Sequence, residues 1–139
     1  MATRIRAEIS EKSKYWISKH RHYELKHFCL QYPSWKKAYR EALNSNIIAA
    51  AAKPHIGGET VADLTARYAM KRAWYGDRIQ LVEKAAREAD ETIYFYILKA
   101  VTEGLSYTNL KSRYDIPCGK DMYYDRYRRF FWLLNKARD

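Results

Sequence analysis

Only two cysteines occur in the 139 residues of this sequence, and they are widely separated. Cys29 and Cys118 form no Cys-x-x-Cys pair, which argues against both a disulfide framework and a zinc ribbon. The sequence therefore predicts reduced thiols, as in cytoplasmic proteins.

Long apolar runs are also missing. The longest run of small apolar residues, IIAAAA at 47–52, is far shorter than the ~20 residues that span a bilayer. The N-terminal stretch MATRIRAEISEK has no apolar signal core. These features predict a soluble, cytoplasmic protein with no membrane partner.

Enzymatic motifs are absent as well. Gly119-Lys120 lacks the preceding glycine and the following Ser or Thr of a phosphate-binding loop, and Gly57-Gly58 is too short for a dinucleotide fingerprint. No Ser, Cys and His residues have recognisable catalytic spacing. We therefore expect neither an enzyme nor a cofactor.

The segment KHRHYELKHFC at 19–29 raises the question of a metal site. On a helix, His20 and His27 share one face while His22 and Cys29 lie on another. Four such side chains cannot converge on one tetrahedral ion without distant residues, so we expect no metal.

What the sequence does contain is a large positive charge. The net charge is +10, and 47% hydrophobic residues supply enough apolar material for a folded core. The number of Lys and Arg residues minus the number of Asp and Glu residues is +7 for residues 1–40, −1 for 41–110 and +4 for 111–139. Basic ends favour a polyanionic partner, chiefly nucleic acid, over an anionic membrane surface or a charge that only aids solubility.

Helical periodicity runs through the chain, and no strand alternation or hairpin signal competes with it. It predicts an all-α fold with five to six helices. The first helix, 13–32, ends at Pro33, and a second helix capped by Ser34 completes a basic helical hairpin over residues 1–44. The predicted apolar stripe of the first helix consists of Trp16, His20, Tyr23, His27 and Leu30.

Residues 45–59 are predicted to form a linker, because Pro54 and Gly57-Gly58 favour a loop. The capping-box pattern TVAD at 60–63 then opens a long helix that reaches about residue 89 and begins the third segment, 60–139. A helix of this length either packs under the flanking segments or forms a homodimer. Asp90 caps the helix that follows, and Gly104 ends it.

The last part of the chain predicts a C-terminal helix-turn-helix. Ser106 caps a brief helix, DIPCG at 115–119 forms a tight turn, and a second helix runs over 120–136. The predicted core side of this last helix consists of Tyr124, Tyr127, Phe131 and Leu134. In helix-turn-helix proteins such a helix enters the major groove, but an ordinary helical hairpin with solvated arginines is the alternative.

Candidate DNA contacts follow from this arrangement. Lys120 and Tyr123 lie near the start of the last helix, where side chains reach base edges in a helix-turn-helix. Arg128 and Arg129 lie one or two turns later, where the helix leaves the groove and contacts the DNA backbone. Asp121 and Asp125 are expected to pair with those two arginines rather than with a metal. The predicted DNA-binding residues are Lys120, Tyr123, Arg126, Arg128, Arg129, Lys111 and Arg113, with Lys19, Arg21 and Lys26 as a second phosphate-contacting surface.

Residues 91–134, ETIYFYILKAVTEGLSYTNLKSRYDIPCGKDMYYDRYRRFFWLL, resemble the helix-turn-helix of sigma-factor region 4 and of ArpU/RinA-type phage late-operon regulators. The chain as a whole, including YWISKHRHYELKHFCLQYPSWKKA, is similar to small prophage proteins of Gram-positive gut bacteria. The resemblance implies a transcription regulator that binds promoter DNA through its last helix, with RNA polymerase as a further partner. The sequence departs from the sigma pattern at Pro117-Cys118, where a small polar cap is usual.

Together these features predict sequence-specific binding of double-stranded DNA by a phage-type transcription regulator. Two other functions stay open. One is a protein-interaction factor, such as an adaptor or inhibitor of a host nucleic-acid enzyme, and the other is a DNA-binding subunit of phage packaging machinery. A duplex-sized basic surface that includes the last helix would favour the regulator.

Overall fold

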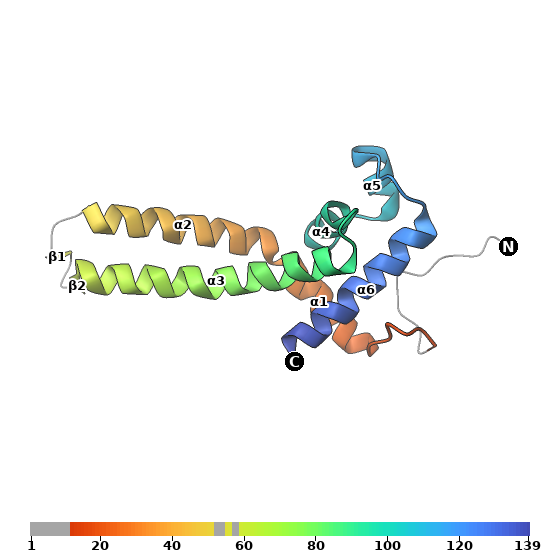
Figure 1. Ribbon diagram of the computed structural model, residues 1–139. Coiled ribbons are helices and arrows are strands. Elements are labelled where there is room, and N and C mark those ends of the chain that lie inside the picture. The colour runs from red at the N-terminus through yellow and green to blue at the C-terminus, as the bar shows by residue number, and fades with distance from the viewer. Residues whose placement is uncertain (1–11, 52–54, 57–58) are drawn as a thin grey trace. The chain divides into compact units, whose positions relative to one another are not determined.

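The computed structural model describes residues 12–51, 55, 56 and 59–139. This part of the chain forms six α-helices and one short strand pair, which confirms the predicted all-α class (Figure 1). No helix within it is both long and apolar enough to cross a membrane.

The chain divides into two compact units. Unit 1 joins the residues up to Gln31 to Leu81–Asp139, and unit 2 is Tyr32–Gln80. This division differs from the predicted boundaries at 44 and 59, because the first helix packs against helices from the far end of the sequence. Sequence proximity therefore does not define the units.

Unit 2 contains α2 (Tyr32–Ala51), β1 (His55–Ile56), β2 (Glu59–Thr60) and the first part of α3 (Val61–Ala89). Helix α2 extends beyond the predicted end because its Ala-rich run has the highest helix propensity. The two strands pair antiparallel, with His55 opposite Thr60, in a stretch for which the sequence carries no strand signal. The other predicted loop residues, 52–54 and 57–58, lie outside the described residues.

Helix α3 begins with the predicted capping box. The Asp63 backbone N–H donates to Thr60 Oγ1 at 3.1 Å, and the Thr60 N–H donates to the Asp63 carboxylate at 3.4 Å. Gly76 does not interrupt the helix, and a Cβ there would lie 3.4 Å from the ring of Tyr39, at an ordinary van der Waals distance. The buried residues along this helix include Leu64, Ile79, Val82, Ala86 and Ala89.

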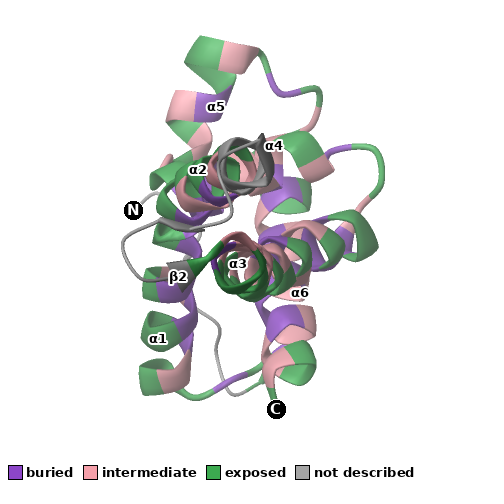
Figure 2. Ribbon diagram, turned by 90° about the vertical axis from the view of Figure 1, so that its left-hand side faces the viewer, coloured by how far each residue is buried: buried purple, intermediate pink, exposed green. Residues whose placement is uncertain are grey.

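Unit 1 contains α1 (Lys19–Leu30), the end of α3, α4 (Tyr94–Glu103), α5 (Tyr107–Tyr114) and α6 (Lys120–Arg138). Helix α1 packs against α4 and α6, and α4 also packs against α5. Buried and exposed residues alternate along α1 and α6, as expected for amphipathic helices (Figure 2). Leu25, Ile97 and Phe130 are completely buried between these helices.

The predicted apolar stripe of α1 was wrong. Trp16 lies before the helix, and both Trp16 and Leu30 are 45% exposed. The buried residues of α1 are His22, Leu25, Phe28 and Cys29. Because apolar residues occur on both sides of this helix, spacing alone does not identify the buried side. The helix is also shorter than predicted, and Pro33 lies in the first turn of α2, a position that proline tolerates.

Candidate nucleic-acid interface

The segment from α5 to α6 is built by short-range contacts. Ser106 Oγ accepts from the Asn109 N–H and Asn109 Oδ1 accepts from the Ser106 N–H, both at 3.2 Å, which confirms the predicted cap. Asp115 then takes the left-handed conformation, φ 49°, that ends α5. The Tyr107 hydroxyl donates to the Cys118 carbonyl at 2.7 Å. These contacts fix the turn, and so they fix the direction of α6.

The buried face of α6 differs from the predicted one at its start. It consists of Tyr123, Tyr127, Phe130, Phe131 and Leu134. Tyr123 is only 1% exposed and lies 5.7 Å from the ring of Tyr107, whereas Tyr124 is half-buried. Burial raises the pKa of the Tyr123 hydroxyl. The predicted base contact by Tyr123 was therefore wrong, because its ring supports the turn from inside.

Arg126 is occupied by structural contacts. Its Nε donates to the Asp90 carboxylate at 2.9 Å, and its guanidinium also pairs with Asp125. The same Asp90 carboxylate accepts from the backbone N–H groups of Thr92 at 2.7 Å and Ile93 at 3.1 Å. Burial acts to raise the pKa of Asp90, but these hydrogen bonds outweigh it and hold the pKa below its ordinary value. Arg126 thus joins α6 to the turn before α4, and its side chain stays 34% exposed, so its assignment as a DNA contact stays a prediction.

The two arginines predicted to meet the DNA backbone are half-buried. The Nε of Arg129 is buried and donates no hydrogen bond to a described residue. Asp125 pairs with Arg126 and not with Arg129 as the helical spacing predicted. Arg128 and Arg129 are therefore less accessible than the sequence suggested.

Three other predicted contacts lie in the last turn of α5 or at the start of α6, and we name Lys111, Arg113 and Lys120 the tip set. Lys111 donates to the Ile116 carbonyl at 3.4 Å and pairs with Asp115 at 3.3 Å, so it lies against the turn. This ion pair is largely exposed and therefore weak. Arg113 and Lys120 are exposed, and neither forms an ion pair with a described residue.

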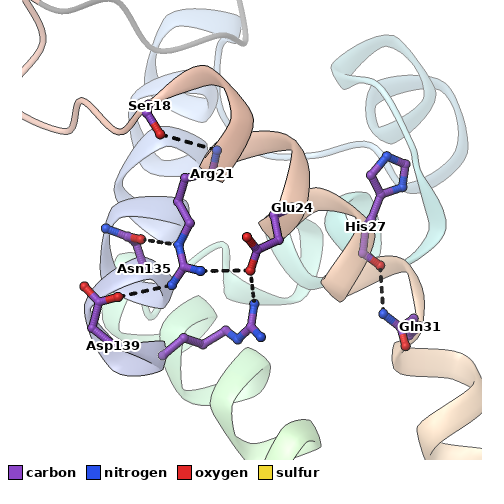
Figure 3. A network of polar contacts seen from close by, with 8 residues as sticks. Ser18, Arg21, Glu24, His27, Gln31, Asn135 and Asp139 are labelled. Carbon is purple, nitrogen blue, oxygen red and sulfur yellow. Dashed lines mark hydrogen bonds and ion pairs between the residues drawn. The ribbon is translucent and has the colours of Figure 1, made fainter.

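The predicted contacts from α1 do not join the tip set. The Arg21 guanidinium donates to Asn135 at 2.7 Å, to Glu24 at 2.8 Å and to Asp139 at 3.3 Å (Figure 3). Arg138 donates to the same Glu24 carboxylate at 3.3 Å. We name these five residues the far-end network.

The far-end network and the tip set occupy opposite ends of α6. Asn135 and Asp139 lie at the end of α6, and Lys120 is its first residue. At ~1.5 Å per residue the helix is about 28 Å long, so one compact basic surface does not include both ends. Lys19 is exposed near the far end, while Lys26 is half-buried further along α1.

The histidine and cysteine side chains of α1 are spread over the helix. The ring of His22 packs on Phe131, with centroids 4.9 Å apart, and Cys29 is buried, which raises the pKa of its thiol. His20 and His27 are exposed. No cluster of three or more His, Cys, Asp or Glu residues suited to a metal ion occurs in the described part of the chain.

No family model, curated protein or solved structure matches this chain. Two features of the site had no signal in the sequence: the ion pair between Asp90 and Arg126, and the burial of Tyr123 in place of Tyr124.

Proposed function

We propose that this protein binds double-stranded DNA through the helix-turn-helix formed by α5 and α6. The observation that carries the proposal is the tip set, in which Arg113 and Lys120 are exposed and have no carboxylate partner among the described residues. The turn beside them is held by the buried Ile116 and Tyr123. Basic residues at the start of a helix, beside a turn that buried side chains hold in place, can make the contacts that position a helix in a major groove.

The proposal gives the residues of the tip distinct roles. Lys120, the first residue of α6, is the candidate for a guanine edge, and the neighbouring exposed Asp121 can accept from the amino group of cytosine. Lys111 and Arg113 are the candidates for phosphate contacts. A role in transcription, with a phage-type regulator as the closest description, is supported by the resemblance of residues 91–134.

Selection of genomic fragments by the purified protein, followed by sequencing, tests the proposal and supplies a binding site. On that site, Lys120→Ala is expected to cost about 1–3 kcal/mol if the lysine contacts a base. Lys84→Ala is the matched control, because Lys84 is an exposed lysine of unit 1 on α3, with its side chain 77% exposed. Absence of any enriched fragment, or equal binding by both variants, would contradict the proposal.

A protein-interaction factor is the second candidate. It is favoured by Met122, which is 42% exposed, because methionine is enriched at protein interfaces. The exposed Asp121 beside it carries a negative charge that repels phosphates. Capture of a protein partner that Met122→Ala weakens, with no enrichment of DNA, would support this candidate instead.

A further inference from the structure

A cavity of about 270 Å³ lies in unit 1 where α1, α4 and α6 meet. Its wall includes Lys26 and Leu30 from α1, Ala100 and Val101 from α4, and three tyrosines and Phe131 from α6. All lining residues belong to unit 1, so the cavity does not depend on unit 2. No member of the tip set lines it, and the proposed DNA contacts leave it unused.

Lys26 gives this cavity a positive charge. Its side chain is half-buried, forms no ion pair with a described residue, and places its ammonium 5.7 Å from the ring centre of Tyr23. No aspartate or glutamate lines the cavity. A lysine that lines a cavity with no carboxylate in its wall favours an anionic ligand there.

The rest of the wall suits an apolar body. Beside the aliphatic residues, Tyr124 lies 4.9 Å from Tyr123 and 5.9 Å from Tyr127, measured between ring centroids. Burial raises the pKa of Tyr127, so its hydroxyl remains a neutral donor. The Ser106 hydroxyl at the cavity edge is already engaged by Asn109 at 3.0 Å. A mainly apolar cavity with few polar groups is the usual form of a small-molecule site.

We propose that this cavity binds a small monocarboxylic acid, with its apolar body against the α6 aromatic rings and its carboxylate at the Lys26 ammonium. One cation matches one negative charge, whereas a phosphate with nearly two charges would need further cations. The volume lies just below the ~300–1,000 Å³ of most ligand pockets, which favours a ligand of about ten heavy atoms. None of the proposed DNA contacts lines the cavity, although Ser106 and Tyr123, which support the turn between α5 and α6, do.

The test is a titration of the full chain with 3-phenylpropanoate, followed through backbone amide NMR shifts, with 3-phenylpropan-1-ol as the uncharged match. Shifts are expected to cluster at the α4 and α6 residues of the cavity. Lys26→Met should weaken binding of the acid about fivefold or more and leave binding of the alcohol unchanged. Lys19→Met is the matched control, because Lys19 is an exposed lysine of the same helix that does not line the cavity.

A second variant tests whether binding needs the open volume of the cavity, independently of the Lys26 charge. Ala100, which is 3% exposed, lines the cavity, so Ala100→Leu should fill it and weaken binding of the acid and the alcohol alike. Circular dichroism checks that this variant folds, and Lys26→Met decides the question if it does not. Scattered shifts, no shifts at millimolar acid, or equal acid binding by Lys26→Met and the parent would overturn the proposal.

Discussion

The two ends of α6 contain similar basic residues but use them differently. At the C-terminal end, Arg21 and Arg138 share the Glu24 carboxylate, and Arg21 also bonds Asn135 and Asp139. At the N-terminal end, the one ion pair of the tip set among the described residues is the exposed pair between Lys111 and Asp115. Basic side chains thus stabilise the fold at one end and face solvent at the other.

This difference shows why net charge is a poor guide to a binding surface. The +7 charge of residues 1–40 predicted a second phosphate-contacting surface on α1. Yet Arg21 is satisfied within unit 1, because the fold brings two acidic residues and an amide to it. Whether a basic side chain can contact a phosphate depends on the acidic and polar neighbours that it gains on folding, and the net charge does not report those neighbours.

The largest loss of folding stability is expected when the Tyr123 ring, which supports the turn between α5 and α6 from inside, is removed. Tyr123→Ala should lower the free energy of unfolding by about 3–5 kcal/mol, because a fully buried aromatic side chain is lost. Tyr124→Ala, one residue later and half-buried, should cost clearly less. Urea unfolding measures both. Equal losses would mean that the two tyrosines share the core and that the tip is not built on Tyr123.

Most of the local structure could be predicted from sequence, because its causes lie within a few residues. The capping box at Thr60, the cap at Ser106 and the helix stop at Gly104 all depend on sequence neighbours, and all three occur. The buried side of α6 could not be decided this way. Tyr123 and Tyr124 stand four and three residues before Tyr127, and both spacings fit one helical face.

The availability of each arginine could not be predicted either. Arg126 is paired with Asp90, which lies 36 residues earlier in the chain, and Arg21 is hydrogen-bonded to groups 114 and 118 residues away. No local pattern encodes such pairings, because they arise only when the helices pack. Among the predicted contacts beside the turn, Lys111, Arg113 and Lys120 are exposed because α5 ends and α6 begins at the surface.

A smaller effect is expected at the joint between the tip and the rest of unit 1. Asp90→Asn keeps a side-chain acceptor but removes the charge that pairs with Arg126, so it should cost about 1 kcal/mol at neutral pH. Because the folded pKa of Asp90 lies below its unfolded value, this stabilisation is present at neutral pH and is lost as pH falls through the folded pKa.

Urea unfolding of the parent and of Asp90→Asn at several pH values checks this sign. The difference between the two proteins should shrink in acid. A difference that grew as pH fell would mean that the Asp90 carboxylate is not held in its charged form by Arg126.

The smallest stability effect is expected in the far-end network. Arg21→Gln should cost no more than about 1 kcal/mol, because its acidic partners Glu24 and Asp139 are more than half exposed. Lys19→Gln, on the same helix, should have no measurable effect. Thermal unfolding compares the two variants, and an unchanged midpoint for Arg21→Gln would show that the network contributes nothing to stability.

The central claim is that the tip set, and not the far end, meets DNA, and salt titration of duplex binding tests it most directly. Two triple variants remove equal charge: Lys111→Gln, Arg113→Gln and Lys120→Gln at the tip, and Lys19→Gln, Arg21→Gln and Arg138→Gln at the far end. The slope of log K against log salt should fall in magnitude by about 0.9 for each lost phosphate contact in the tip variant. The far-end variant should keep the parent slope, with circular dichroism confirming that both variants fold. Equal flattening in both variants, or a parent slope near zero, would contradict the account.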